Sequence, residues 1–548
     1  MAQTTAGGGQ PAAPQTFFSR RATGLVREMS FTDAAIFNVL PAVPGAVIAY
    51  FLLWGLSAFP GADLILDMVI VGFFSTLLAL AFGFLSVAMP RSGADYILNS
   101  RTLHPALGLA GSVTLMISGL LSIGYWSLWT IQGGLGPTLI QVGASLGNNK
   151  TLQSWGSTLS GSGAPTFILA LLLVLGTTWA LVSGLRLVMR IQFWLFAVAM
   201  AGFLLTIVLL LFTSHQAFVN GFNAWAQQYT SQSDSYNYFL QQASKNGYTF
   251  NGQHDWKATL FATGVVMSTG IWAWFSVNMA GEVKQANTMR HVGAILVGQA
   301  ITYGCLIIMT VLLYNVISET FLGALNNLNG TAAYTLPAPP YYVMLVSLIW
   351  NNPILALILG ITFFAWFPLV VYIQWIQPIR ALFAYAFDGV FPMWIANIND
   401  RFHTPINATI LTTLIGIGCL VWATFLSKSF FALLALAAIV GFPAMFLVGV
   451  SALIFPWRRP ELFRTSAMGL KVLGVPIVSI TGIGAMIVAI WGFYDYLTQP
   501  GLLANPGGAA IVTFGTFILA FVYYFIARAV RMRQGTNLDL NFAVVPPE

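Results

Sequence analysis

"NVLPAVPGAVIAY", residues 38–50, opens the first long apolar run of the chain and also interrupts it. Pro41, Pro44 and Gly45 lie close together in this stretch. Proline removes a backbone donor and clashes with the preceding turn, and glycine adds conformational freedom. In a membrane, broken helix is tolerated only where it is buried in protein or lines a cavity. The stretch therefore predicts a discontinuous first span, either to bind a ligand or only to kink the helix for packing.

The composition places most of the chain in lipid. Hydrophobic residues make up 57% of the 548 residues and charged residues only 7%, whereas a typical soluble domain is about 25% charged. We therefore expect an all-α integral membrane protein. Small polar residues and then Arg20, Arg21 and Arg27 precede the first apolar run. Residues 1–30 are expected to be a disordered cytosolic tail rather than a signal peptide.

Twelve stretches are long and apolar enough for a spanning helix of about 20 residues. They are residues 34–57, 66–88, 106–133, 165–183, 191–213, 259–281, 292–318, 346–378, 407–427, 429–455, 473–497 and 509–528. With a cytosolic N-terminus, the outer segments hold few of the 22 basic residues, namely Lys150, Lys245, Lys257 and Lys428. This asymmetry follows the positive-inside rule, so both termini are predicted to be cytosolic and the protein to lie in the plasma membrane. The rule also accounts for the net charge of +7 without a nucleic-acid partner.

Long polar insertions then lie on the outer side of the membrane. They cover residues 138–164, 214–258 and 319–345. Asn149 and Asn329 each begin a glycosylation sequon in these insertions, and whether either is glycosylated stays open.

A second interruption appears in the sixth span, within "VVMSTGIWAWFSVNMAGEV", residues 265–283. Ser268, Thr269 and Gly270 are three weak helix formers in a row. The two interrupted spans are the first of two sets of five, and because five is odd the second set must run upside down. The sequence thus predicts a 5+5 inverted repeat with two further helices. The predicted parts are 31–213 (first repeat), 214–258 (extracellular loop), 259–455 (second repeat), 473–528 (last two helices) and 529–548 (cytosolic tail).

The two breaks supply the first candidate binding residues. Free amides after the first break can hold an anion with help from the helix dipole, and free carbonyls at the second can hold an ammonium group. The candidates are Ala42, Val43, Pro44, Gly45, Ala46, Ser268, Thr269 and Gly270.

Three predicted cytosolic loops carry a family resemblance. They read "MPRSGADYILNSRTLHPALG" (89–108), "GEVKQANTMRHVGAI" (281–295) and "RALFAYAFDGVFPMWIANINDRFHTPINA" (380–408). Together they resemble the amino acid–polyamine–organocation (APC) superfamily of permeases, over about residues 30–530, and "FPWRRPELFR" (455–464) is similar to a further loop of that family. The most specific matches in the third loop are Arg380, Asp388, Gly389, Pro392, Thr404 and Pro405.

Departures from the family patterns mark a distant branch. A single glycine, Gly45, stands where the family often has a glycine-rich run, and Ala94 replaces the second glycine of P-x-x-G-G. Ala286 and Asn287 stand where the family prefers Asn-Pro. Carboxylate capture at the first break is therefore a weaker expectation than the fold.

The resemblance implies a secondary transporter of amino acids or related amines that works by alternating access. It implies an inner gate at the cytosolic span ends, for which the candidates are Arg91, Asp95, Glu282, Lys284, Arg380 and Asp388. The alternative is a set of solvated surface pairs, each worth under about 1 kcal/mol. Asp63 and Asp67 lie at the outer end of the second span, where they can simply face water.

Aromatic residues beside the second break and in the third span, which lines the site in the family, are candidates for the pocket or the outer gate. They are Trp272, Trp274, Phe275, Tyr125, Trp126 and Trp129. Plain packing is the alternative. An aromatic pocket would suit an apolar or cationic side chain.

The resemblance also bears on the coupling ion, although the sequence carries the signature of neither sodium nor proton coupling. Sodium-coupled relatives use Ser or Thr in the eighth span, and none occurs between Thr362 and Thr404. Some proton-coupled relatives use a lysine in the fifth span, and 191–213 has none. Protons are favoured over sodium, and exchange of amino acids or amines without a coupling ion stays open.

Other functions find little support. The sequence has no H-E-x-x-H motif, no G-x-S-x-G motif with a paired histidine and no Walker loop, so an enzyme is not expected. Cys305 and Cys419 lie in apolar runs and are expected to be packing residues. The histidines are predicted in loops or at span ends, so neither a metal nor another cofactor is expected: His104, His215, His254, His291 and His403. A membrane sensor that binds without transport is the remaining alternative, and a monomer is favoured.

Overall fold

The computed structural model describes residues 25–350, 352–427, 429–466, 469–543 and 545. Most of the predicted N-terminal tail, residues 1–24, lies outside the described residues. The first half contains α1 (Phe31–Val39), α2 (Pro44–Ala58), α3 (Leu64–Ala88), α4 (Ala94–Thr102), α5 (Pro105–Trp129), α6 (Gly136–Ser145), α7 (Lys150–Ser160), α8 (Ala164–Val182) and α9 (Leu185–Leu211), with a π-helical segment, η1 (Thr130–Leu135), between α5 and α6.

The rest of the chain is also almost entirely helical. Its α-helices are α10 (His215–Thr230), α11 (Ser235–Lys245), α12 (Trp256–Gly270), α13 (Met289–Val316), α14 (Glu319–Leu328), α15 (Tyr342–Trp350), α16 (Pro353–Phe364), α17 (Trp366–Phe387), α18 (Ile406–Val421), α19 (Phe430–Arg458), α20 (Pro460–Thr465), α21 (Ile477–Thr498), α22 (Pro506–Arg533) and α23 (Leu538–Ala543). The other elements are η2 (Phe275–Asn278), η3 (Ala280–Glu282), η4 (Met393–Ala396), η5 (Trp422–Ser427) and a hairpin of β1 (Lys471–Val472) and β2 (Val475–Pro476).

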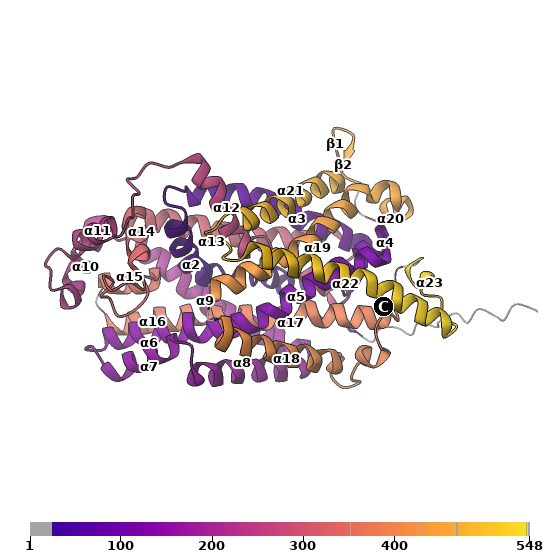
Figure 1. Ribbon diagram of the computed structural model, residues 1–548, viewed down its shortest axis with the longest axis horizontal. Coiled ribbons are helices and arrows are strands. Elements are labelled where there is room, and N and C mark those ends of the chain that lie inside the picture. The colour runs from indigo at the N-terminus through magenta and orange to yellow at the C-terminus, as the bar shows by residue number, and fades with distance from the viewer. Residues whose placement is uncertain (1–24, 351, 428, 467–468, 544, 546–548) are drawn as a thin grey trace, which may run out of the picture.

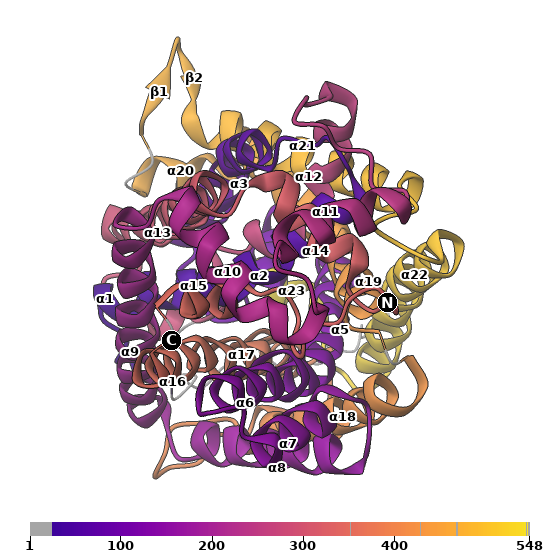
Figure 2. The ribbon, with the colours of Figure 1, turned by 90° about the vertical axis from the view of Figure 1, so that its left-hand side faces the viewer.

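The long helices run side by side along one axis of the molecule (Figure 1). The insertion helices α10, α11, α14 and α15 gather at one end, and α4, α20, α23 and the β hairpin gather at the other. Seen from the insertion end, α10, α11, α14 and α15 lie across the ends of the long helices (Figure 2). The polar insertions expected outside the membrane are therefore largely helical.

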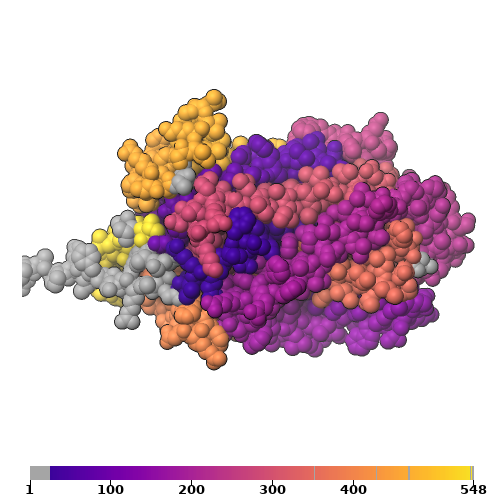
Figure 3. Space-filling model, turned by 180° about the vertical axis from the view of Figure 1, so that it is seen from behind, coloured from indigo at the N-terminus to yellow at the C-terminus, as the bar shows by residue number. Residues whose placement is uncertain are grey.

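The helices differ in how much protein surrounds them. The apolar window of the first span, Phe31–Ala58, is 100% buried, whereas those of Leu185–Leu211 and Pro506–Arg533 are 28% and 22% buried. The first span is thus a core element, and α9 and α22 present apolar side chains to lipid. From behind, α1 is visible between α9 and α13 (Figure 3).

Eleven helices among the described residues are long and apolar enough to cross a membrane. The predicted sixth span, 259–281, is missing from this set because α12 ends at Gly270 and only turns and short 3-10 segments follow it. The predicted eighth span, 346–378, needs correction as well. Its first residues belong to α15, and a separate helix starts at Pro353, where the Asn352 side chain accepts from the amides of Ile354 and Leu355.

The predicted eleventh span also begins too early. Residues 471–476 form the hairpin instead of helix, because Leu473 and Gly474 both take positive φ angles, 50° and 82°. Such angles turn the chain tightly and cannot continue a right-handed helix.

Candidate functional site

The first span breaks between α1 and α2, as the prolines predict. Val43 takes a φ of 29° there, a strained backbone for a β-branched residue. The amides of Ala42 and Val43 both donate to the carbonyl of Val39, at 3.1 Å each, and those of Ala46 and Val47 donate to the carbonyl of Val43, at 2.8 and 3.0 Å. The break is therefore wound tightly, and most of its amides are already used.

Gly45 is required for close packing at this break. A Cβ at this position would overlap the indole nitrogen of Trp366 on α17. The carbonyl of Gly45 also accepts a hydrogen bond from the hydroxyl of Tyr342 on α15, at 2.8 Å. The break thus connects the core to one of the insertion helices.

The second break exposes carbonyls rather than amides. The carbonyl of Ser268 accepts from Trp272 Nε1 at 3.1 Å. The carbonyl of Gly270 accepts from the hydroxyls of Ser75 and Tyr303, at 3.1 and 3.2 Å. Side chains therefore take the place of the helix amides that end with α12.

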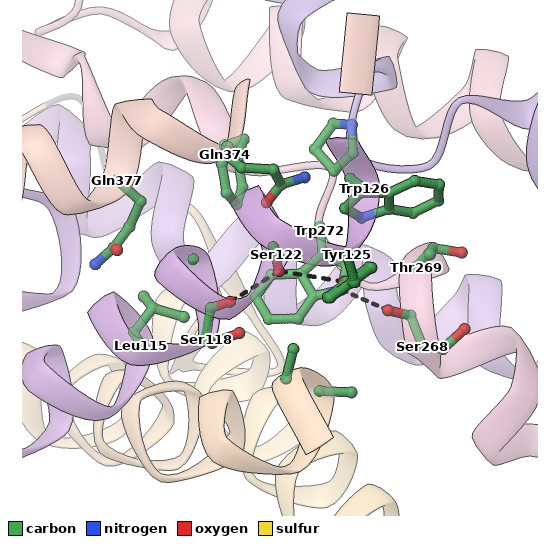
Figure 4. A pocket seen from close by; sticks show the side chains of 15 residues that line it. Leu115, Ser118, Ser122, Tyr125, Trp126, Ser268, Thr269, Trp272, Gln374 and Gln377 are labelled. Atoms are coloured by element: carbon green, nitrogen blue, oxygen red, sulfur yellow. Dashed lines mark hydrogen bonds between the residues drawn. The ribbon is translucent and has the colours of Figure 1, made fainter. Parts of the chain in front are cut away.

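A small cavity lies between the two breaks and α5, α17 and α19 (Figure 4). Its volume is about 30 Å³, roughly the space of a single water molecule. Its walls are uncharged. They are formed by Pro41, Leu115, Ser118, Gly119, Ser122, Tyr125, Trp126, Ser268, Thr269, Trp272, Phe275, Gln374, Gln377, Ala437 and Ala438.

The predicted binding residues divide between wall and surroundings. Those in the wall are Ser268, Thr269, Trp272, Phe275, Tyr125 and Trp126. Those that do not line the cavity are Ala42, Val43, Pro44, Gly45, Ala46, Gly270 and Trp274. The ring of Trp274 stacks on Phe82 of α3, with centroids 3.7 Å apart, and its role here is packing.

Polar groups in the wall include residues that the sequence did not single out. Ser122 donates to the carbonyl of Ser118 at 2.8 Å and lies 3.2 Å from the hydroxyl of Tyr125. Figure 4 shows Ser122 and Tyr125 between Gln374 on one side and Ser268 on the other. Gln374 and Gln377 stand three residues apart in an apolar span, and that spacing was the available signal.

The polar side chains of the wall differ in whether they have a hydrogen-bond partner. Gln374 has one, because its amide nitrogen donates to the carbonyl of Val370 at 3.1 Å. Gln377 is buried, and neither its amide nitrogen nor its amide oxygen has a partner among the described residues. The hydroxyl of Thr269 is likewise unpartnered there. Buried polar groups are nearly always hydrogen-bonded, so these atoms are available to water or to a ligand.

Aromatic rings close the cavity toward the insertion end. Trp129 stacks on Phe430 with centroids 4.1 Å apart and an interplanar angle of 15°. Tyr50, Trp126 and Phe431 surround this pair, with centroid separations of 5.3–5.5 Å from Phe430. We call these five rings the outer aromatic cluster. Trp129 thus belongs to the cluster and does not line the cavity itself.

Two buried ion pairs lie on the side away from this cluster. Arg380 donates from Nε and Nη2 to the two carboxylate oxygens of Glu282, at 2.7 and 2.6 Å. Arg101 pairs with Asp388 at 2.7 Å, and both side chains are 1% exposed. Asp388 follows Arg380 closely in sequence but pairs with Arg101, a residue that was not among the candidates.

The remaining gate candidates, Lys284, Arg91 and Asp95, differ in burial and in hydrogen-bond partners. The Lys284 side chain is exposed, and its amide donates to the carbonyl of Met29 at 2.9 Å. Arg91 Nη1 donates to the carbonyl of Pro90 at 2.9 Å. Asp95 is fully buried beside the Ser112 hydroxyl, 3.4 Å away. Burial raises the pKa of Asp95 to about 7.

The comparison with protein families agrees with this geometry. The family described as amino acid permease matches residues 34–527, a range that includes both breaks, the cavity wall and the buried ion pairs. No curated protein matches the chain.

Proposed function

The chain belongs to the amino acid permease family, a family of membrane transporters of amino acids and amines, and from this premise we propose proton-coupled uptake by alternating access. The transported molecule occupies the cavity between the two breaks. The outer aromatic cluster opens to the outside and the Glu282–Arg380 and Arg101–Asp388 pairs open to the cytosol, in turn. We also propose that the protein lies in the plasma membrane with both termini in the cytosol.

One observation carries the proposal. The cavity lies where two broken helices meet, with the outer aromatic cluster on one side and the buried ion pairs on the other. At about 30 Å³ it is too small for an amino acid, so binding requires the helices around it to move. A closed site between two separate barriers is the arrangement that alternating access needs.

The wall favours a small zwitterion or amine with an apolar side chain. It has no charged side chain, but it has the unpartnered amide of Gln377 and the hydroxyl of Thr269. Trp272, Tyr125 and Phe275 supply apolar and π surfaces. Such a wall suits burial of an apolar side chain or a cation–π contact with an ammonium group.

The test is uptake into proteoliposomes. A labelled panel of amino acids and polyamines is offered under an inward proton gradient, an inward sodium gradient and no gradient. We expect accumulation under the proton gradient alone. Ala438→Leu fills the cavity wall and should abolish uptake, whereas Ala201→Leu on exposed α9 should leave it unchanged.

Each other result has a definite meaning. Exchange of preloaded compound without accumulation would identify an antiporter. Saturable binding with neither uptake nor exchange would identify a sensor. Sodium-driven accumulation would refute the proposed coupling ion.

A further inference from the structure

Two carboxylates are buried inside the bundle, away from the cavity. Asp67 on α3 and Asp495 on α21 are both 0% exposed. The expectation that Asp67 faces water is therefore wrong, because α12, α13 and α21 cover this face of α3. Helices α3, α12 and α21 lie next to one another in both ribbon views (Figures 1 and 2).

The two carboxylates have unequal surroundings. Asp495 Oδ2 accepts from the hydroxyl of Thr263 at 2.7 Å and from Trp491 Nε1 at 3.0 Å, while Oδ1 has no partner. Neither carboxylate oxygen of Asp67 has a partner among the described residues. Hydrogen bonds stabilise the ionised form of a carboxylate, and Asp67 receives none.

The charges around this pair are all negative or absent. Asp67 lies close enough to Asp495 and to Asp63 for their charges to repel, and Tyr496 lies close enough to Asp495 for the charge of Asp495 to act on its phenol. No Lys, Arg or His among the described residues forms an ion pair with Asp67 or Asp495. Two unpaired negative charges in a low-dielectric interior are costly, so the pair holds a proton in this closed state. The hydrogen bonds place that proton on Asp67 and leave Asp495 ionised.

Asp495 is connected directly to the helix that carries the cavity wall. Trp491 Nε1 also donates to Thr263 Oγ1 at 2.8 Å, and the hydroxyl of Tyr496 donates to the carbonyl of Gly264 at 2.9 Å. These bonds fasten α21 to α12 just before Ser268, where α12 reaches the cavity. Hydrogen bonds to an ionised acceptor are roughly twice as strong as neutral ones. Transfer of a proton to Asp495 would therefore loosen the hold of α21 on α12.

We propose that Asp67 and Asp495 form the proton-coupling site of this transporter. A proton from the outer water binds to the Asp67 carboxylate, and its passage to Asp495 frees α12 to move when the cavity is occupied. The proton then leaves to the cytosol as the inner ion pairs open. This inference rests on the proposed proton-coupled uptake, and it assigns coupling to the outer halves of α3 and α21 instead of to Asp95, Glu282 or Asp388.

The experiment separates proton-driven accumulation from exchange. Wild type, Asp67→Asn, Asp495→Asn and Asp234→Asn are reconstituted into proteoliposomes. Accumulation under an inward proton gradient and counterflow of preloaded compound at equal pH are measured with the best compound of the panel. We expect the Asp67 and Asp495 variants to lose accumulation at least tenfold while keeping counterflow. Asp234→Asn should behave like wild type, because Asp234 is an exposed cap of α11 in the insertion and Asn still caps that helix.

Proton movement gives a direct second readout. A pH-sensitive dye inside the vesicles should report compound-driven acidification in wild type and none in Asp67→Asn. Asp67→Glu keeps a carboxyl group and should restore the signal with an altered pH profile, which covers the case in which Asp67→Asn does not fold. Accumulation and acidification of wild-type size in Asp67→Asn would overturn the inference alone. A wild type that transports nothing, or only exchanges, would refute the proposed function first and this inference with it.

Discussion

Glu282→Gln tests whether the inner ion pair holds the cytosolic end closed. The carboxylate accepts two short hydrogen bonds from Arg380, and the side chains of Glu282 and Arg380 are 3% and 6% exposed. Removing one partner of a buried pair costs about 3–5 kcal/mol, because the other charge is stranded. Glutamine keeps one acceptor, so we take about 3 kcal/mol, the low end. This cost falls on the closed state alone and shifts the open-to-closed ratio about a hundredfold.

Thiol labelling from the cytosolic side measures this shift. Thr269→Cys places a thiol in the cavity wall. Cys305 and Cys419 are free and are replaced first to leave a single reactive site. In inside-out vesicles, a charged thiol reagent should label this cysteine much faster in the Glu282→Gln background, up to about a hundredfold where opening limits the rate.

Two controls define what would contradict this reasoning. Glu28→Gln removes the partner of Arg186 in a surface pair whose arginine is 83% exposed, so labelling should change little. Glu282→Gln combined with Arg380→Gln strands no charge and should return labelling toward the parent rate. Equal labelling rates in the parent and in Glu282→Gln, with both proteins folded, would show that this pair does not hold the gate.

Further predictions concern packing, pH and the cavity amides. In Gly124→Ala the new Cβ would lie 2.5 Å from the backbone of α18, so Tm should fall by the equivalent of about 1–3 kcal/mol. Gly418 has open space around it, so Gly418→Ala should not lower Tm. Burial raises the pKa of Asp95 to about 7, so the folded protein binds a proton there that the unfolded chain releases near pH 4. Stability should therefore fall as pH rises from about 4 to 7, and Asp95→Asn should flatten that part of a Tm–pH profile. Gln377→Leu removes a buried, unpartnered amide, so it should raise the Tm of the empty protein and weaken binding of the transported compound about three- to tenfold. Gln374→Leu loses an existing hydrogen bond and should not raise Tm.

The sequence was sufficient for most of the spans because lipid makes hydropathy a strong constraint on fold. It was insufficient where an apolar segment is buried by protein instead of lipid. Residues 346–350 are as apolar as a span, but they belong to α15, an insertion helix. In the sixth span the helix ends at Gly270, and hydropathy alone does not show where a helix ends inside an apolar stretch.

The partners in the buried ion pairs could not be predicted from the sequence, because the fold determines which charged side chains meet. Local motifs located Glu282, Arg380 and Asp388, but Arg101 is 287 positions from its partner and carries no family signal. Asp495 was overlooked for a similar reason. A single carboxylate near a span end resembles an interfacial residue until α12 and α3 are packed against it.

The two barriers differ in chemistry, and this difference has a mechanical consequence. The outer aromatic cluster is held by contact between rings, whose separation exposes apolar surface to water. The inner pairs are held by charge, and their separation lets water solvate each ion, which offsets much of the lost attraction. Helix α12 connects the two ends, because Thr263 is fastened to Asp495 near the outside and the chain after Gly270 continues to Glu282. A displacement of α12 therefore reaches the cavity wall and the inner gate together. In this arrangement the protonation state of Asp67 and Asp495 favours one barrier over the other without a charged group in the cavity itself.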